Sequence, residues 1–329
     1  MKALVTGGGG FLGKAIIERL LLKNIEVVSV ARTHHARLAG LGVEQVCVDL
    51  GDMSPDHPAF AGCDIVFHVA AKAGVWGNYA EYYHANVLGT TNVIAACRQH
   101  GIDKLVYTSS PSVVFGAEPI EGADESLTYP QHFDAPYPET KAVAEQLVVA
   151  ANDSTLTTVT LRPHLIWGPE DNHLVPRILE RGRKRQLRRI GRQENLVDCV
   201  YIDNAADAHV LAAEKLISGA DIGGKTYFIS QGDPRPLWDI VNAILACADV
   251  APIERHIPTK AAYAIGWLLE KIYTISGIRT EPRITRFVAR ELSCAHWFDI
   301  SAARRDLGYQ PRISIEQGLD KLRESLHNK

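Results

Sequence analysis

The chain opens with a short apolar run that leads directly into a loop of glycines. Ala3–Thr6 has the composition of a buried strand, Gly7–Gly13 follows it, and a helical pattern begins at Phe11. Glycine is needed in such a loop because a Cβ would keep a phosphate away from the backbone N–H groups at the helix start. A flexible turn is the simpler interpretation, but a position between strand and helix favours a dinucleotide site. Its expected contacts are Gly7, Gly10, Phe11, Leu12 and Gly13.

Apolar runs and helix-period segments alternate through the first half of the chain. The expected strands are Ala3–Thr6, Glu26–Val30, Gln45–Val48, Ile65–His68, Leu105–Thr108 and Val159–Leu161, and the expected helices include Phe11–Lys23, Asn86–His100 and Glu139–Ala151. This alternation implies right-handed crossovers and a parallel sheet covered on both faces. We therefore predict an α/β fold, a Rossmann-type doubly wound parallel sheet with a smaller C-terminal substrate lobe.

The second half of the chain has a looser pattern, interrupted by prolines and tryptophans. A chain of 329 residues is also larger than one core easily fills. We assign residues 1–165 to the nucleotide-binding domain and 166–329 to a lobe over the carboxyl edge of the sheet. Residues of about 196–230, including Thr226–Ile229, are expected to return to the core.

Composition excludes several classes of protein. With 35 basic and 38 acidic side chains and a net charge of −3, whole-surface attraction to nucleic acid is not expected. Six cysteines without CxxC or zinc spacing predict free thiols in a reducing compartment and no metal site. No charged leader precedes the first strand, and the longest apolar stretch, Ala261–Leu269, is under half of the roughly 20 residues of a membrane span. We expect a cytoplasmic protein without a membrane span.

The end of the second strand indicates the cofactor. An NAD site has an acidic residue there for the ribose 2′-hydroxyl, whereas this chain has Val30-Ala31-Arg32. An arginine fork binds a 2′-phosphate that a carboxylate would repel, so Arg32 predicts NADPH/NADP+ and makes NADH the less favoured cofactor. The alternative is a surface arginine in a loop that is basic throughout.

The third strand ends in Asp49 and Leu50. This position faces the adenine ring in a doubly wound nucleotide site, and both residues are expected cofactor contacts. An ordinary helix cap is the alternative for Asp49.

Tyr137 and Lys141 are four residues apart and share one face of an expected helix. A free tyrosine titrates near pH 10, too high for ready proton exchange at neutral pH. At about 4 Å and an effective dielectric of about 20, an ammonium attracts a phenolate by on the order of 4 kcal/mol, enough to lower the tyrosine pKa by two to three units. We expect Tyr137 to exchange the proton and Lys141 to activate it. A tyrosine stacked over a lysine stem on an exposed helix is the alternative.

Two serines end the fifth strand, where open α/β sheets bind ligands. Ser110 is expected to hydrogen-bond a substrate carbonyl oxygen. Ser109 is the alternative because side chains alternate along a strand, and either serine could cap a turn.

Three motifs in order, TGGGGFLG, YTSSPSV and APYPETK, resemble the extended short-chain dehydrogenase/reductase family over nearly the whole chain. The nearest branch is that of 3β-hydroxysteroid and sterol-4α-carboxylate dehydrogenases. The resemblance implies an NAD(P)H-dependent oxidoreductase acting on CH–OH and C=O groups, and a homodimer. It carries the family's Ser-Tyr-Lys triad onto Ser110, Tyr137 and Lys141, and its nicotinamide-flanking segment onto Leu161–Ile166. Further implied cofactor contacts are Ala70, Ala71, Pro163 and Ile166.

Within that branch, His68–Tyr79, Leu165–Arg177 and Asn195–His209 resemble bacterial reductases of 2-alkyl-3-oxoalkanoates in long-chain olefin biosynthesis. The resemblance implies reduction of a fatty β-keto acid to the β-hydroxy acid, with a 3β-hydroxysteroid or sterol dehydrogenase as the runner-up. Relatives that act on nucleotide sugars carry an arginine in an RDFVYV-like strand, where this chain has Val197. That departure argues against a sugar-nucleotide enzyme.

Two segments of the lobe leave alternatives open. Eight basic residues fall within the sixteen positions from Arg177 to Arg192. They form a solvated helix face, an anchor for a substrate carboxylate or a docking site for an acidic partner such as another enzyme of the pathway. Ala261–Ile275 has apolar residues at helical spacing, which suits either a lid over an apolar substrate channel or a plain core helix.

Two classes of function remain at this stage. The leading hypothesis is a ketone reductase acting on a small hydrophobic carboxylate or a steroid. The rival is a non-catalytic NADP(H) sensor that regulates a partner. A sensor does not need a tyrosine and a lysine at helical spacing behind a serine, so the sequence favours the enzyme.

Overall fold

A seven-stranded parallel sheet is the centre of the protein. The computed structural model describes residues 1–116 and 118–328. The strand order is β12-β7-β5-β4-β1-β2-β3. The strands are β1 (Lys2–Thr6), β2 (Glu26–Ala31), β3 (Glu44–Cys47), β4 (Ile65–His68), β5 (Lys104–Thr108), β7 (Thr157–Pro163) and β12 (Thr226–Ile229). Every strand predicted from the sequence lies in this sheet, and the doubly wound Rossmann-type fold is confirmed.

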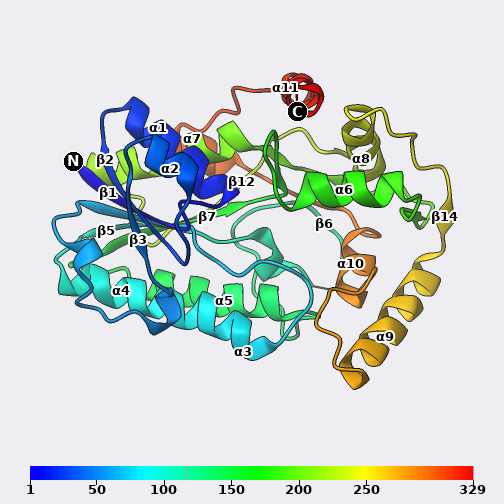
Figure 1. The fold of residues 1–329 in the computed structure, drawn as a ribbon, viewed down its shortest axis with the longest axis horizontal. Coiled ribbons are helices and arrows are strands. Elements are labelled where there is room, and N and C mark those ends of the chain that lie inside the picture. The colour runs from blue at the N-terminus through cyan, green and yellow to red at the C-terminus, as the bar shows by residue number, and fades with distance from the viewer. Residues whose placement is uncertain (117, 329) are drawn as a thin grey trace.

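Helices cover both faces of the sheet (Figure 1). On one face lie α1 (Phe11–Leu22), α2 (Ala36–Gly40) and α7 (Ile202–Ile217), and on the other α3 (Tyr79–Tyr82), α4 (Gly89–Gln99) and α5 (Pro136–Ala150). Leu12, Ile16 and Leu20 of α1 are buried at helical spacing. Arg19 forms ion pairs of 2.8 Å with both Asp203 and Asp207 of α7, which ties two distant parts of the chain together.

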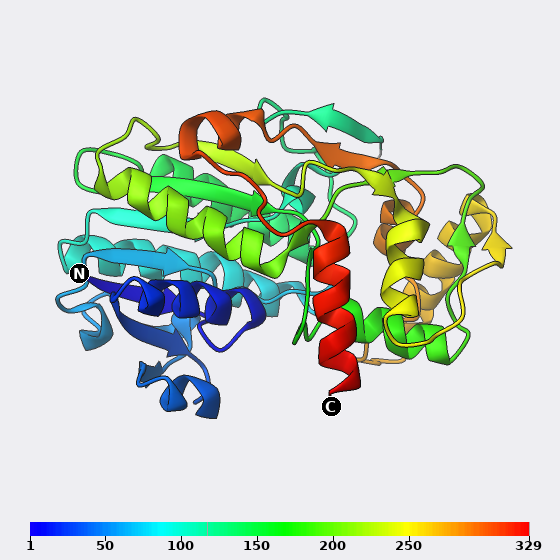
Figure 2. The ribbon, with the colours of Figure 1, turned by 90° about the horizontal axis from the view of Figure 1, so that it is seen from above.

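Most of the remaining helices and short strands form the lobe, which lies toward the right in Figure 2, with the C-terminal helix near the middle of that view. Its helices are α6 (Leu174–Arg183), α8 (Leu237–Ala246), α9 (Thr259–Ile275), α10 (Arg286–Glu291) and α11 (Ile315–His327). A four-stranded sheet joins β13 (Arg235–Pro236), β10 (Leu196–Val197), β15 (His296–Phe298) and β6 (Ile120–Ala123), while β8 (Ile166–Trp167) pairs with β11 (Val200–Tyr201) and β9 (Arg189–Ile190) with β14 (His256–Ile257). No described helix is long and apolar enough to cross a membrane.

Two parts of the chain after β8 join the main sheet. Helix α7 packs against α1, and β12 is hydrogen-bonded to β7, with Thr226 opposite Thr160. Both lie in the segment that the sequence predicted to return to the core.

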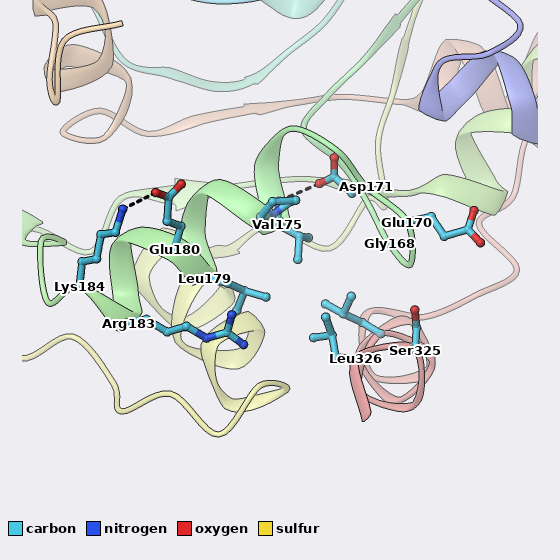
Figure 3. Close-up of a pocket in the computed structure, with 12 residues that line it drawn as sticks. Gly168, Glu170, Asp171, Val175, Leu179, Glu180, Arg183, Lys184, Ser325 and Leu326 are labelled. Carbon is cyan, nitrogen blue, oxygen red and sulfur yellow. Dashed lines mark hydrogen bonds and ion pairs between the residues drawn. The ribbon is translucent and has the colours of Figure 1, made fainter. Parts of the chain in front are cut away.

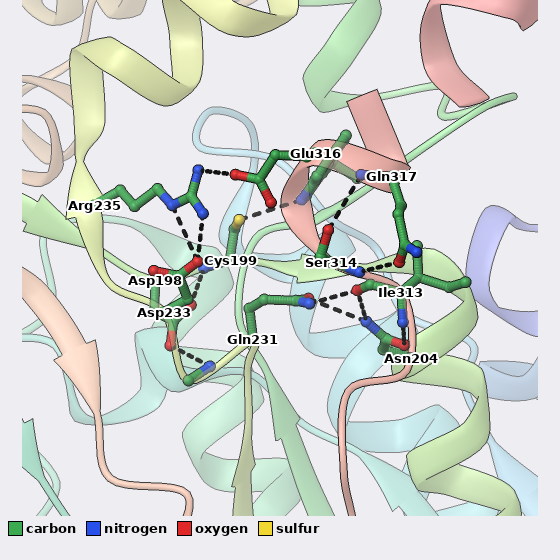
Figure 4. A network of polar contacts seen from close by, with 12 residues as sticks. Asp198, Cys199, Asn204, Gln231, Asp233, Arg235, Ile313, Ser314, Glu316 and Gln317 are labelled. Carbon is green, nitrogen blue, oxygen red and sulfur yellow. Dashed lines mark hydrogen bonds and ion pairs between the residues drawn. The ribbon is translucent and has the colours of Figure 1, made fainter. Parts of the chain in front are cut away.

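A polar network fastens the C-terminal segment to the end of β12 (Figure 4). Asn204 of α7 and Gln231 both donate side-chain hydrogen bonds to the carbonyl oxygen of Ile313, at 2.8 and 2.5 Å. Arg235 forms an ion pair of 2.6 Å with Glu316 of α11. Helix α11 is therefore held by Ile313, just before its first residue, and by Glu316 in its first turn.

Of the two alternatives for helix α9, the plain core helix is wrong, and the lid over a substrate channel stays a prediction. Its exposed apolar side chains are Ile265, Trp267, Leu268, Ile272 and Ile275. The opposite face is packed, and the buried Glu270 accepts hydrogen bonds of 2.6 Å from the backbone N–H and the Nε–H of Arg286, which joins α9 to α10.

The basic segment from Arg177 to Arg192 is partly neutralised. Arg177 and Arg181 pair with Glu281, the latter at 3.6 Å. Lys184 pairs with Glu180 at 2.5 Å, and Arg189 lies 3.7 Å from Asp239. The segment is thus more than a solvated helix face. Whether the segment binds a substrate carboxylate or an acidic partner protein stays a prediction.

Candidate active site

The glycine loop leaves the start of α1 open to a phosphate. Gly7 has a φ of +69°, and a Cβ there would lie 2.8 Å from the Cα of Ala70. A Cβ on Gly13 would lie 2.2 Å from the carbonyl oxygen of Gly7. Gly10 caps α1 without a side-chain hydrogen bond. Because the N–H groups of the first turn have no cap from a side chain, the loop, with Phe11 and Leu12 behind it, fits the pyrophosphate of a dinucleotide.

A basic hollow of about 350 Å³ adjoins this loop. Its lining includes Gly9, Lys14, His34, His35 and Arg37. Glu170, from the loop after β8, pairs with both Lys14 and Arg37 across the hollow. Arg32 is exposed directly after β2, and its side chain makes no hydrogen bond or ion pair within residues 1–116 and 118–328. Arg32 is therefore free to meet a 2′-phosphate, and Arg37 is a second candidate that the sequence placed only in a basic loop.

Asp49 caps a short helix at the end of β3. Its carboxylate accepts a hydrogen bond from the Gly51 N–H at 2.9 Å and lies 3.5 Å from Nε2 of His84. Leu50 beside it is buried. Asp49 is thus a helix cap, as the alternative interpretation had it. Contact of Asp49 or Leu50 with adenine stays a prediction.

The other expected cofactor contacts also follow strands of the main sheet. Ala70 and Ala71 come after β4, and the Ala70 N–H donates to Oγ1 of Thr6 at 3.1 Å. Pro163 is the last residue of β7, and Ile166 begins β8. All four therefore lie near the carboxyl edge at which the glycine loop sits.

Lys141 is buried between α5 and β5. Its Nζ donates to the Tyr107 hydroxyl at 2.6 Å and to the backbone carbonyl of Thr108 at 2.7 Å. Burial lowers the pKa of Lys141 to about 7, and the negative charge of Glu145, one turn further along α5, opposes that shift. The ammonium is therefore fixed in place by β5 rather than lying loosely along the helix.

Tyr137 lies in the first turn of α5, which begins at Pro136 because proline at the first helical position needs no N–H partner. Burial raises the pKa of Tyr137, hydrogen bonding with Ser110 opposes the shift, and the charge of Glu291 adds to it. The expected lowering of this pKa by Lys141 is wrong. Desolvation of the phenolate is the largest influence on it, and the Lys141 ammonium is bound to Tyr107 and Thr108 instead.

The two serines have different surroundings. Ser109 is buried, and within the described part of the chain its hydroxyl has no hydrogen-bond partner. Ser110 is half-buried, its hydroxyl accepts from the Ser112 N–H at 3.2 Å, and it opposes the upward shift of the Tyr137 pKa. This influence favours Ser110 over Ser109 as the neighbour of the tyrosine, and the contact of Ser110 with a substrate stays a prediction.

Asn86 was not singled out from the sequence. It is buried in a π-helical turn, Tyr83–Leu88, and its Nδ2 donates to Thr140 Oγ1 at 3.0 Å and to the carbonyl of Lys72 at 3.1 Å. Thr140 directly precedes Lys141 on α5. Neither the burial of Asn86 nor the π turn can be read from the sequence, and π turns are frequent at functional sites.

A separate cavity of about 340 Å³ opens between α6 and α11 (Figure 3). Leu179 and Arg183 line it from α6, and Leu326 lines it from α11. Its lining includes none of the three candidate catalytic residues, so it lies apart from the chemistry described above.

Comparison with known proteins places the chain in a family. Residues 4–257 match the model of the 3-beta hydroxysteroid dehydrogenase/isomerase family. The 2-alkyl-3-oxoalkanoate reductase of Stenotrophomonas maltophilia is 51% identical over 99% of both chains. The mouse decarboxylating sterol-4-alpha-carboxylate 3-dehydrogenase is 33% identical over 99% of this chain and 91% of its own length.

Solved structures agree with the fold. The crystal structure of gox2253 is 27% identical, with a TM-score of 0.78 over 99% of this chain and 98% of the other. MoeE5 in complex with UDP-glucose and NAD is 23% identical, with a TM-score of 0.77 over 100% and 99%, and shows likeness of fold alone. The chain belongs to the 3-beta hydroxysteroid dehydrogenase/isomerase family, whose members are NAD(P)-dependent oxidoreductases of the extended short-chain dehydrogenase/reductase type.

Proposed function

We propose that this protein uses NADPH to reduce the keto group of a 2-alkyl-3-oxoalkanoate to the hydroxyl group of a 2-alkyl-3-hydroxyalkanoate. The observation that carries the proposal is the 51% identity, over nearly all of both chains, with the Stenotrophomonas maltophilia enzyme of that name. Val197 supports it, because this buried residue of β10 has no group with which to hold a substrate phosphate.

The residues of the chain bind the carbonyl and supply the proton. Ser110 and Tyr137 hydrogen-bond the keto oxygen, and Tyr137 gives up its phenolic proton as that oxygen gains charge. The Lys141 ammonium, 2.6 Å from the Tyr107 hydroxyl, stabilises the phenolate that forms. The bound NADPH supplies the hydride. Ketone, NADPH and one proton thus become secondary alcohol and NADP+.

The cofactor preference rests on the basic end of β2. Arg32 stands between Ala31 and Thr33, neither of which is acidic, and Arg37 lines the hollow beside the glycine loop. A doubly charged 2′-phosphate accepts strong, charge-assisted hydrogen bonds from guanidinium groups. The 2′-hydroxyl of NADH accepts only weaker hydrogen bonds from the same groups. NADPH is therefore the proposed cofactor, and NADH the poorer one.

The test follows NADPH absorbance at 340 nm with 2-alkyl-3-oxoalkanoates of increasing alkyl length. Each buried methylene adds about 0.8 kcal/mol, so kcat/KM is expected to rise over several carbons. NADH should support slower turnover. Absence of turnover with every fatty β-keto acid would contradict the proposal.

A steroid or sterol dehydrogenase is the second candidate. The 33% identity with the mouse sterol dehydrogenase over 99% of this chain favours it. A steroid offers similar apolar area but a rigid shape, so its turnover does not depend on alkyl length. Faster turnover of a 3β-hydroxysteroid than of any 2-alkyl-3-oxoalkanoate or 2-alkyl-3-hydroxyalkanoate would favour this candidate. The homodimer, the cytoplasmic location and docking to pathway enzymes stay predictions.

A further inference from the structure

Glu170 places a carboxylate in the basic hollow beside the glycine loop. One wall of that hollow, His34–Leu38, follows β2, and the other includes Gly9 and Lys14 around the start of α1. In a doubly wound fold the first wall faces the ribose 2′ position of a dinucleotide, and the second faces its pyrophosphate. The hollow of about 350 Å³ is therefore the place at which a 2′-phosphate enters.

The cations of this hollow have an internal anionic partner. Glu170 forms ion pairs with Lys14 of α1 and with Arg37 of α2, so that one carboxylate bridges two helices. Burial raises the pKa of Glu170, but the hydrogen bonds from Arg37 and Lys14 outweigh burial and lower the pKa. The carboxylate is therefore charged at neutral pH, and it holds the cations that a phosphate needs.

The loop that carries Glu170 is fixed next to this residue. Asp171 caps α6, and its carboxylate accepts hydrogen bonds from the N–H groups of His173 and Val175 at 2.8 and 2.7 Å. Glu170 itself has a φ of +66°, in the left-handed region that glycine adopts without cost and other residues rarely adopt. Strain of this kind concentrates at ligand clamps and switch regions. Figure 3 shows the Glu170 side chain extending away from Leu179 and the cavity beside α6.

Both terminal nitrogens of Arg37 face carboxylates. Nη1 pairs with Glu170, and Nη2 lies 3.4 Å from Oε1 of Glu18. A phosphate on the same guanidinium would lie about 4 Å from one of these carboxylates, and like charges at that distance repel each other. Glu170 lines the hollow, so it is the carboxylate that an entering phosphate meets. The uncharged 2′-hydroxyl of NADH meets no such repulsion.

We propose that Glu170 is a specificity-determining residue for the cofactor, an internal anion that competes with the 2′-phosphate of NADPH for Arg37. NADPH displaces the carboxylate from this guanidinium, whereas NADH leaves it in place. Glu170 therefore makes the preference for NADPH over NADH smaller than the arginines alone would give. This inference rests on the cofactor part of the proposed function, and it does not depend on which ketone is reduced.

The test measures binding of 2′,5′-ADP and 5′-AMP to the full chain by isothermal titration calorimetry. The two nucleotides differ only in the 2′-phosphate, and neither is reduced or oxidised, so the readout is independent of turnover. Because the ion pairs of Glu170 are partly exposed to solvent, each is worth a small free energy. Glu170→Gln should raise the preference for 2′,5′-ADP over 5′-AMP about fivefold.

Two further variants test whether the effect acts through Arg37. In an Arg37→Ala background, Glu170→Gln should change the preference less than about twofold, because the competition has lost its cation. Glu18→Gln is the matched control. Glu18 also faces Arg37, at 3.4 Å, but it is not among the described residues that line the hollow. Its loss should change the preference less than about twofold.

The outcomes separate the two proposals. If neither the natural chain nor Glu170→Gln binds 2′,5′-ADP more tightly than 5′-AMP, the proposed NADPH preference and this inference both fail. If 2′,5′-ADP is preferred, an unchanged or lower preference in Glu170→Gln overturns the role of Glu170 alone. An equal gain in Glu18→Gln, or a gain that persists without Arg37, overturns it as well.

Discussion

Glu145 forms a buried ion pair below the candidate active site. Its carboxylate accepts from Nε and Nη2 of Arg162 at 3.0 and 2.5 Å, and from the Tyr129 hydroxyl at 2.7 Å. The side chains of Glu145 and Arg162 are 0% and 4% exposed. Glu145→Gln keeps the volume and an oxygen for Tyr129, so it removes the charge and little else.

The expected loss of stability comes from the charge of Arg162, which would be buried without a partner. Arg162 keeps its proton at any physiological pH, and its Nη1 already has no partner among the described residues. Removal of one member of a buried pair costs about 3–5 kcal/mol of unfolding free energy. Changing Arg162 to Met as well removes the uncompensated charge and leaves an apolar chain against Phe228, whose ring lies 5.1 Å from the guanidinium carbon. The double variant should therefore recover most of the loss.

Urea unfolding followed by far-UV circular dichroism measures the free energies. We expect Glu145→Gln to lose about 3–5 kcal/mol, and the double variant to lose less than about 2 kcal/mol. Glu139→Gln, in the first turn of the same helix, is the matched control and should lose less than about 1 kcal/mol. A single-variant loss below about 1 kcal/mol, or a double variant less stable than the single one, would refute the reasoning.

Further predictions concern the cofactor and the chemistry. Tyr137→Phe should reduce NADPH oxidation to under a tenth while NADPH binding, measured by fluorescence titration, stays nearly unchanged. Arg32→Ala should weaken NADPH by about 1.5–3 kcal/mol, or ten- to a hundredfold in Kd, and leave NADH almost unaffected; equal losses would remove Arg32 from the 2′-phosphate site. Gly13→Ala should abolish binding of both cofactors, because its Cβ would lie 2.2 Å from the Gly7 carbonyl oxygen. The folded Lys141 has a pKa of about 7, against roughly 10.4 when unfolded, so between these values the unfolded chain binds more protons and stability rises with pH. Lys141→Met should remove that part of the slope between pH 7 and 9 in urea titrations, and an unchanged slope would contradict the lowered pKa.

The sequence was most informative where structure is local. Ala3–Thr6, the glycine loop and the helix from Phe11 follow one another without a gap, and each has a composition that suits one conformation. The alternation of strands and helices then limits the connections to right-handed crossovers, which is why the parallel sheet was predicted. Tyr137 and Lys141 were found for the same reason, since four-residue spacing alone places them on one helix face.

Contacts between distant segments were beyond that kind of reasoning. The partners of the Lys141 ammonium, Tyr107 and the Thr108 carbonyl, depend on how closely α5 packs on β5. Glu170 follows β8, and no local pattern relates it to Lys14 or Arg37. The exposed face of α9 has the same apolar spacing as a core helix, so only its packing reveals which side meets solvent.

The pKa of Tyr137 shows how this limit affects chemistry. A spacing argument counts the attraction between a phenolate and an ammonium, but it omits the cost of burying the phenolate. The same burial lowers the pKa of Lys141 to about 7, so the ammonium is itself partly lost at neutral pH. Both shifts favour a phenol that retains its proton until a carbonyl oxygen is ready to accept it. For the proposed reaction that is the useful state, because a reductase must donate this proton whereas a dehydrogenase must withdraw it.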